Sequence, residues 1–272
     1  MLQENAATGL LFLIGIFYGS LTMGLAAVLA VCCGTITALL LGYEKDDIEQ
    51  GLYGFSAALV GVALLLFLKP VFVVWLLVIV GSVWAAMIQH FFIKRKIPGF
   101  TLPFVLVTWA ILFCVGRLYP DITAVSSDAS APTGQYFTFA LRGFGQVIFQ
   151  GGIVSGLLFL VAVFINSPLA AFYGLAGAVV AAILAAMFSA PVADVGMGLF
   201  SYNAVLCAIV FAEDKLKGVI WGLISVVLSV LIALAMFRYQ LVQLTFPFVA
   251  ATCISLIFKN MKLNFSRRIR QS

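Results

Sequence analysis

Long apolar runs are the feature that most constrains the fold of this chain. The runs at residues 71–93, 168–190 and 217–237 exceed the roughly 18 residues that a bilayer-spanning helix needs. Further apolar stretches fill most of the remaining sequence, at 6–42, 52–69, 102–118, 136–165, 198–212 and 240–258. Only 9% of the residues are charged, whereas a soluble domain has about 25%. We therefore expect an all-α membrane protein of roughly ten spans or part-spans, with the lipid bilayer as its solvent and no soluble domain.

The basic residues are concentrated in two places, at 94–96 and in the tail 259–272. Because basic residues near spans stay on the cytoplasmic side, we expect the C-terminus to be cytoplasmic. A nucleic-acid partner is disfavoured, since no soluble domain presents the tail. The N-terminal sequence MLQENAATG lacks the basic leading region of a cleavable signal peptide.

The cysteines all lie in apolar segments, where buried thiols behave as small hydrophobic side chains. Their spacing matches neither a zinc site nor a secreted disulfide framework. We therefore expect no metal and no cofactor. The residues are Cys32, Cys33, Cys114, Cys207 and Cys253.

An internal repeat links the two parts of the chain. The phrase GLYGFSAALVG at 51–61 returns 147 positions later as GLFSYNAVLCA at 198–208. At the same offset, TGLLFLIGIFYGS at 8–20 matches SGLLFLVAVFINS at 155–167. Near the end of each half, FTLPF and LTFPF match at an offset of 144. Each half therefore contains the same sequence motifs in the same order.

The repeat predicts how the chain is divided. An odd number of spans in each half, five by our reading, requires the two halves to be inverted, which places a site at their interface near the bilayer midplane. A duplicated helical bundle without a pore is the alternative. The expected parts are a first membrane repeat (1–118), an extramembrane linker (119–134), a second membrane repeat (135–258) and a basic cytoplasmic tail (259–272).

Ionisable residues are rare inside the apolar runs, and such residues mark proton relays and ion pathways. Arg142 is the main exception, and His90, the single histidine, lies near the end of a span without a visible partner. An ion-coupled pump is therefore disfavoured, and His90 is interpreted as an interfacial side chain. The polar groups that remain at depth are neutral: Gln146, Asn203, Thr101 and Thr245.

The two threonines in this set occupy equivalent positions in the two halves. Thr101 and Thr245 each precede an apolar–Pro–Phe step. Because proline interrupts helical hydrogen bonding, a helix broken there frees backbone carbonyls. Free carbonyls at depth are tolerated only against protein or a water-filled cavity. We expect both sites to supply hydroxyl and carbonyl oxygens to a pore; the alternative is a threonine-repaired kink facing another helix.

Each half also repeats an aromatic residue followed four positions later by leucine. Phe55 precedes Leu59, and Tyr202 precedes Leu206. Positions i and i+4 share one face of a helix, so each half offers a ring and an aliphatic side chain in a stack. Ordinary core packing is the alternative explanation.

The ordered set of phrases resembles the urea transporter family. The resemblance lies in LRGFGQVIFQ with SGLLFLVAVFINSPLAA at 141–171, GLFSYNAVL at 198–206 and LTFPF at 244–248, and in the matching first-half phrases. It covers almost the whole chain. It implies two inverted repeats of five spans, each with a re-entrant half-helix lining a central pore. It also implies a homotrimer with one pore per subunit and passive, channel-like passage of urea, here across a bacterial cell inner membrane.

The resemblance also implies which residues line the pore. In the family, a glutamine or glutamate, an aromatic residue three positions later, the aromatic residue and leucine of the GLYGF phrase, and the threonine of FTLPF do so. The second half then supplies Gln146, Phe149, Tyr202, Leu206 and Thr245, and the first half supplies Phe55, Leu59 and Thr101.

The first half departs from the family pattern at its start. At the offset of 147, the counterpart of Gln146 falls before Met1, and the counterpart of Phe149 is Leu2. The LRGFGQ element of the first half is therefore missing. We expect one of three explanations: the start codon is misassigned, the chain is trimmed, or the pore is asymmetric.

Two single positions also depart from the pattern. Asn203 follows the family, but its counterpart is Ser56. Tyr202 carries a hydroxyl that Phe55 lacks, which adds one oxygen that could face the pathway.

The expected function is reversible, facilitated passage of urea through stacked rings and neutral oxygens. The runner-up is a channel of the same architecture for another small neutral solute, such as a urea analogue or ammonia. A truncated, non-transporting membrane subunit is a further alternative. An enzyme is disfavoured, because the single histidine is peripheral and no serine has a visible base.

Overall fold

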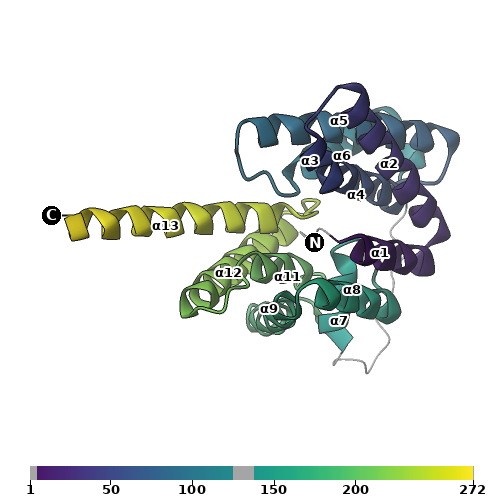
Figure 1. Cartoon of the computed structure of the whole chain (residues 1–272). Coiled ribbons are helices and arrows are strands. Elements are labelled where there is room, and N and C mark those ends of the chain that lie inside the picture. The colour runs from purple at the N-terminus through teal and green to yellow at the C-terminus, as the bar shows by residue number, and fades with distance from the viewer. Residues whose placement is uncertain (1–4, 125–137, 272) are drawn as a thin grey trace.

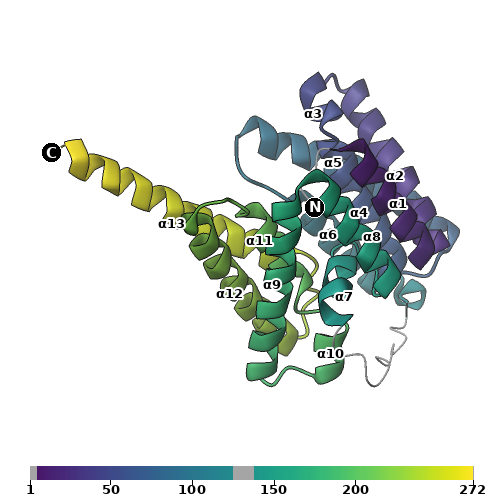
Figure 2. The ribbon, with the colours of Figure 1, turned by 60° about the horizontal axis from the view of Figure 1, so that its bottom comes forward.

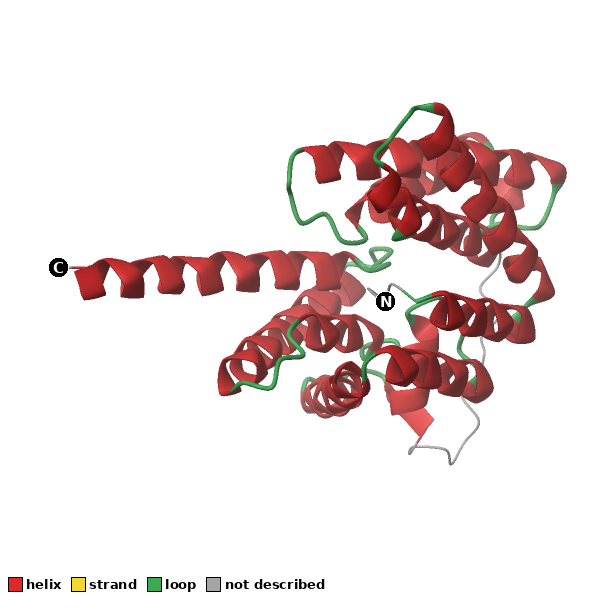
Figure 3. Cartoon of the chain, viewed as in Figure 1, coloured by secondary structure: helices red, strands yellow, loops and turns green. Residues whose placement is uncertain are grey.

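The structure is a computed structural model that describes residues 5–124 and 138–271, with side chains up to Met261. Within these ranges the ordered elements are helices, apart from one isolated β-bridge between Leu68 and Thr123 (Figures 1 and 3). The first half contains α1 (Ala6–Gly19), α2 (Leu21–Leu40), α3 (Lys45–Glu49), α4 (Leu52–Phe67), α5 (Phe72–Lys94) and α6 (Leu102–Leu118), followed by the 3-10 helix η1 (Pro120–Ile122). The second half contains α7 (Phe139–Gln146), α8 (Ile153–Asn166), α9 (Pro168–Met187), α10 (Val192–Gly196), α11 (Tyr202–Val210), α12 (Leu216–Arg238) and α13 (Phe246–Gln271).

The all-helical, apolar character expected from the sequence is confirmed. Four helices, α2, α5, α9 and α12, are long and apolar enough to cross a membrane by length and composition. The shorter apolar helices α1, α4, α6 and α8 have 14 to 17 residues, fewer than the about 20 that a full span needs. Residues 246–261 of α13 form another short apolar helix.

The helix bounds recur at the offsets seen in the sequence. Helices α1 and α8 have 14 residues each, and α2 and α9 have 20 each, at an offset of 147. Helices α5 and α12 have 23 residues each, at an offset of 144. Unusual backbone angles recur too: Phe100 and Leu244, 144 positions apart, have φ values of 46° and 44°. These three helix pairs therefore share order and length, whereas α4 has 16 residues and its counterpart α11 has nine.

The two halves meet through reciprocal contacts between α1 and α8, which lie side by side in Figures 1 and 2. The Thr8 hydroxyl donates to the carbonyl of Ala162 at 2.9 Å, and the Ser155 hydroxyl donates to the carbonyl of Gly15 at 2.8 Å. Ser155 is the counterpart of Thr8, and Ala162 is the counterpart of Gly15. A contact pattern in which i meets j and j meets i is that of a twofold relation between halves.

One aromatic pair also joins two counterpart residues across the interface between the halves. Phe12 and its counterpart Phe159 pack edge to face, with ring centroids 5.2 Å apart. A residue can contact its own counterpart only close to the axis that relates the halves. The line between α1 and α8 therefore marks the centre of the molecule.

The chain segments that flank the repeats are partly described. The expected linker 119–134 begins with η1, which is joined to the first half where Ala124 N–H donates to the Phe67 carbonyl at 2.8 Å. Residues 125–134 of that linker lie outside the described residues. The expected tail 259–272 continues α13 without a break as far as Gln271, and this helix projects beyond the other helices in Figure 1.

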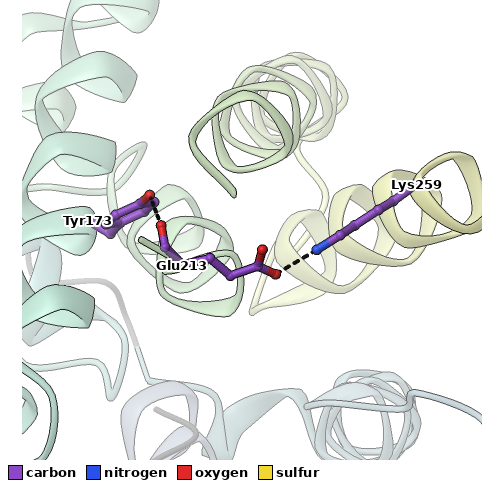
Figure 4. Close-up of polar contacts among 3 residues, drawn as sticks. All are labelled: Tyr173, Glu213 and Lys259. Carbon is purple, nitrogen blue, oxygen red and sulfur yellow. Dashed lines mark hydrogen bonds and ion pairs between the residues drawn. The ribbon is translucent and has the colours of Figure 1, made fainter. Parts of the chain in front are cut away.

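Helix α13 is fastened to the second half before it projects. The Lys259 ammonium lies 2.7 Å from a carboxylate oxygen of Glu213, and the Tyr173 hydroxyl donates to the Glu213 carbonyl at 2.7 Å (Figure 4). Glu213 therefore connects α9, the loop after α11, and α13. The Lys259–Glu213 contact lies where α13 leaves the other helices.

Candidate functional site

The two threonines predicted from the repeat meet at the centre of the molecule. The Thr101 and Thr245 hydroxyls are 2.6 Å apart, and either oxygen can be the donor. Both side chains are buried, with exposed fractions of 3% and 1%. Each threonine comes immediately before a helix, α6 or α13, so the two helix N-termini converge on one pair of hydroxyls.

The prolines after these threonines begin helices and do not interrupt them. Pro103 lies in the first turn of α6, and Pro247 is the second residue of α13. A proline is well tolerated there, because the first N–H groups of a helix have no intrahelical acceptor. The expectation of a helix broken by proline is therefore wrong in its mechanism. The irregular backbone lies before the threonines, where Phe100 and Leu244 have positive φ.

In the second half, the carbonyl of Leu244 is held by two side chains of α11. The Tyr202 hydroxyl donates to this carbonyl at 2.5 Å, and the Asn203 amide nitrogen approaches it at 3.4 Å. The Asn203 amide oxygen accepts from the Phe248 N–H at 3.1 Å, which satisfies an N–H in the first turn of α13. The Tyr202 proton is thus engaged with the backbone next to Thr245.

The first half lacks this network. Ser56, the counterpart of Asn203, is fully buried, and its hydroxyl oxygen has no hydrogen-bond partner among the described residues. Phe55, the counterpart of Tyr202, has no hydroxyl, is half-buried, and lines a cavity. The two halves, called arms from here on, therefore have similar backbones at this position but different polar side chains.

Gln146 and Phe149 lie where α7 ends. The Gln146 amide nitrogen donates to the Met197 carbonyl at 3.2 Å. Phe149 has a φ of 58°, and its ring centroid is 6.1 Å from that of Phe104 in the first half. Phe149 therefore reaches across to the other arm, whereas Gln146 is held within its own arm.

A cavity of about 590 Å³ opens on the first-half side. Of the predicted site residues, Phe55 and Leu59 line it. Its other walls are supplied by Asn5, Ala6, Gly9, Phe12, Leu13, Ile16, Ala27, Val31, Glu49, Gln50, Gly51, Leu52, Ala58, Gln89, Phe100 and Ile148. The predicted residues thus separate into three groups: a cavity wall, the central threonine pair, and a second-half group that is already hydrogen-bonded or packed.

Arg142, the charge noted in the sequence, is buried in α7 with an exposed fraction of 8%. Its guanidinium donates to the Gly151 carbonyl at 3.1 Å and lies 3.0 Å from the Met197 sulfur. Its Nε donates to the Thr138 hydroxyl at 3.3 Å. These contacts tie the two ends of the α7 segment together and to Met197 at the end of α10.

His90 has partners that the sequence did not reveal. Its ring stacks on Tyr43 with centroids 3.6 Å apart, and its Nδ1 lies 3.1 Å from the Tyr53 hydroxyl. The same hydroxyl approaches Asp47 at 3.5 Å. The expectation that His90 lacks a partner is wrong, because its partners lie more than 35 positions away in the chain. The cluster packs α5 against the start of α4.

Sequence reasoning also missed Gln89 and Phe100 as cavity residues. Gln89 lines the cavity, is 7% exposed, and has an amide oxygen with no hydrogen-bond partner among the described residues. The sequence could have indicated Gln89, because an amide side chain is unusual inside the apolar run 71–93. Phe100 is the residue before Thr101 in the repeated phrase, has a positive φ of 46° and lines the cavity.

Comparison with known proteins gives a consistent result. A family profile described as "UT: Urea transporter" matches residues 1–260. Proteins named urea transporter 1 are 27% identical in Mus musculus, over 76% of this chain and 58% of that protein, and 26% identical in Ovis aries, over 96% of this chain and 74% of that protein. The chain therefore spans less than two thirds of the length of the mouse relative.

Proposed function

The chain belongs to the urea transporter family, and from that premise we propose that it carries urea passively across a membrane through a narrow channel. The family is one of transporters and not of enzymes. The observation that carries the proposal is the hydrogen-bonded pair Thr101–Thr245, where the two arms bring neutral oxygens together at the buried centre.

The proposed architecture is two inverted repeats with re-entrant half-helices around one central pore. The shared bounds of three helix pairs and the reciprocal α1–α8 contacts support a twofold relation. The short apolar helix α6, which follows Thr101, and the short apolar part of α13 at 246–261, which follows Thr245, support half-spans. We place the protein in a bacterial cell inner membrane as a homotrimer with a cytoplasmic C-terminus. The positive-inside bias of the basic tail supports that orientation.

Urea has the hydrogen-bonding groups that this centre can satisfy. It presents four N–H donors and one carbonyl acceptor, and a threonine hydroxyl offers one donor and two acceptor lone pairs. When the Thr101–Thr245 bond opens, each hydroxyl gains a free site for the solute. Hydrogen bonds to urea then replace the bond between the two threonines. Urea therefore does not need to bind tightly at this point, and tight binding would slow its release.

The rings restrict what can reach this centre. Phe55 lines the cavity and Phe149 crosses between the arms, so a flat molecule meets aromatic faces before the hydroxyls. An amide-like group that sheds water without replacement loses roughly 2–7 kcal/mol, so the hydroxyls must be close to the rings. A bare ion has a far larger desolvation cost and is excluded.

Downhill transport fits the distribution of charge. In the described ranges, Arg142 is the one charged side chain that is buried, and its guanidinium is occupied by neutral acceptors of its own arm. A coupled pump needs ionisable groups along the pathway whose protonation or occupancy alternates. We therefore propose that flux follows the urea gradient in either direction.

Purified protein in proteoliposomes tests this function. We expect urea to equilibrate faster than in empty vesicles, in both directions, and to stop when the two sides are equal. Accumulation of urea against its gradient, with an imposed proton or sodium gradient, would contradict the proposal. Methylurea and ammonia in the same assay separate a urea channel from a channel for another small neutral solute, and flux equal to empty vesicles identifies a non-transporting subunit.

A further inference from the structure

The backbone carbonyl that precedes each central threonine has a different environment in the two arms. In the second arm, the Leu244 carbonyl accepts from the Tyr202 hydroxyl at 2.5 Å, and the Asn203 amide nitrogen approaches it at 3.4 Å. In the first arm, no group among the described residues donates to the carbonyl of Phe100, the counterpart of Leu244. The φ angles of Phe100 and Leu244 are 46° and 44°, so the two carbonyls occupy matching backbone positions.

The difference follows from the side chains that face these positions. Tyr202 on α11 has Phe55 on α4 as its counterpart, and phenylalanine has no hydroxyl to donate. Ser56 stands at the position of Asn203, and its hydroxyl oxygen has no hydrogen-bond partner in the described part of the chain. The first arm therefore does not replace the donor that Tyr202 supplies in the second.

The open carbonyl belongs to a residue beside an accessible space. Phe100 and Phe55 both line the cavity of about 590 Å³, whereas Leu244 is buried, with an exposed fraction of 2%. A backbone carbonyl that is removed from water costs free energy unless it accepts a hydrogen bond. At membrane depth, a free carbonyl is tolerated where it faces protein or a water-filled cavity. The Phe100 carbonyl therefore needs a donor that enters from the cavity.

The contacts around Phe100 fix this carbonyl close to the central threonines. The Phe100 ring packs against Phe248 of the second arm, with ring centroids 5.3 Å apart. The next residue in the chain is Thr101, whose hydroxyl lies 2.6 Å from that of Thr245. A solute that donates to the Phe100 carbonyl is therefore one residue away from the threonine pair.

The Tyr202 hydroxyl and a urea N–H group need the same kind of acceptor. A backbone carbonyl has two lone pairs, and urea presents four N–H donors. In the second arm, the Tyr202 hydroxyl takes one lone pair of the Leu244 carbonyl, and the Asn203 amide approaches the same oxygen. The second arm thus satisfies internally the acceptor that the first arm leaves for a solute.

We propose that the Phe100 carbonyl binds the N–H groups of the solute in the first arm, and that the Tyr202 hydroxyl occupies the equivalent acceptor in the second arm. Tyr202 is then a built-in competitor that weakens the binding of an N–H-bearing solute next to Thr245. The inference rests on the proposed function, because it assigns binding groups within the same pathway.

Exchange of the two ring residues tests this assignment. Tyr202→Phe frees the Leu244 carbonyl, and Phe55→Tyr adds a donor at the matching position of the first arm. The measurement is the concentration of unlabelled urea that halves the uptake of radiolabelled urea into proteoliposomes. We expect this concentration to fall about threefold in Tyr202→Phe and to rise about threefold in Phe55→Tyr, the effect of one neutral hydrogen bond gained or lost.

Tyr53→Phe is the matched control. It also removes the hydroxyl of a buried tyrosine, but that hydroxyl lies 3.1 Å from His90, and Tyr53 is not among the residues that line the cavity. The half-inhibition concentration should stay unchanged in this variant. A purely structural role of Tyr202 predicts a lower Tm and no gain in urea binding, so tighter binding in Tyr202→Phe separates the two explanations.

Each exchange decides one part of the proposal. An unchanged or lower half-inhibition concentration in Phe55→Tyr would overturn the role of the Phe100 carbonyl, and an unchanged or higher one in Tyr202→Phe would overturn the role of Tyr202. If Tyr202→Phe does not fold, Tyr202→Met, which also lacks a donor, replaces it.

Failure of the proposed function has a different signature. If the unaltered chain carries methylurea or ammonia but not urea, the proposed function is wrong, and the same exchange is measured with the solute that passes. A chain that carries none of the three overturns both. Urea flux in the unaltered chain with no shift in either exchange overturns this inference alone.

Discussion

Asn203 and Ser56 occupy matching positions in the two arms and have opposite environments. Asn203 bonds the Phe248 N–H and approaches the Leu244 carbonyl, whereas the Ser56 hydroxyl oxygen is buried without a partner among the described residues. A buried polar group contributes through its bonds and costs free energy without them. The same position therefore stabilises one arm and strains the other.

This contrast predicts opposite effects of the same truncation. Asn203→Ala should lower the free energy of unfolding by about 1–3 kcal/mol, because it leaves a buried N–H of α13 without its acceptor. Ser56→Ala should be neutral or slightly stabilising. Thermal unfolding in detergent measures both, and equal losses in the two variants would refute the assignment.

Tyr53 and Phe200 are the second matched pair of single residues. Both are buried, but the Tyr53 hydroxyl lies 3.1 Å from His90, whereas the counterpart of His90 is Leu234, beside Phe200. Tyr53→Phe should cost about 0.5–1.5 kcal/mol of stability. Phe200→Tyr should cost more, about 1–3 kcal/mol, because the new hydroxyl enters an apolar cluster. Chemical or thermal unfolding checks the order; a stabilising Phe200→Tyr would contradict it.

Among the elements, the short helices α3 and α10 prepare the turns into α4 and α11. They have five residues each and lie at the offset of 147, with Asp47 and Asp194 as counterparts. Asp47 approaches the Tyr53 hydroxyl. Partial burial raises the pKa of Asp194, since it removes part of the hydration of the carboxylate.

The raised pKa of Asp194 predicts a pH-dependent cost. The folded state binds this proton more tightly than the unfolded state, so its contribution to stability is present at low pH and lost as pH rises through the folded pKa. Asp194→Asn should therefore raise the Tm at pH 7, and the gain should vanish toward pH 4. A gain that is the same at both pH values would show that the charge is not the cause.

The sequence predicted the elements better than it predicted their contacts. Several repeated phrases carried over into helix bounds, because matching local sequence gives matching caps and lengths. In α2 and α9, for example, the N-cap serines Ser20 and Ser167 each accept from an N–H three residues later. The contact between Thr101 and Thr245 was not predicted, since it requires the spatial relation of the halves. His90 was misjudged for the same reason: Tyr43 and Tyr53 are brought to it only when α4 packs on α5.

At the scale of the whole molecule, the proposed inversion has a direct consequence for topology. Leu41 and Phe188 are counterparts just after α2 and α9, and both are exposed, at 51% and 58%. In a background without the native cysteines, Leu41→Cys and Phe188→Cys should be labelled by an impermeant reagent from opposite sides of the membrane. Labelling of both from the same side would show that the halves are parallel.

The two arms contribute to one function only if the solute passes between them. Helices α6 and α13 begin immediately after Thr101 and Thr245, and Phe100, the residue before Thr101, lines the cavity. Thr108 provides a matched control further along α6, because it is also buried and its hydroxyl has no partner among the described residues.

The most direct measurement is urea flux through proteoliposomes containing Thr101→Val, Thr245→Val or Thr108→Val, each at equal protein density. We expect either central substitution to slow urea passage about tenfold, the effect of adding about 1.4 kcal/mol to the barrier, because valine removes the oxygen and keeps the shape. Thr108→Val should transport like the unaltered chain. Unchanged flux in both central variants, or an equal loss in all three, would contradict the account.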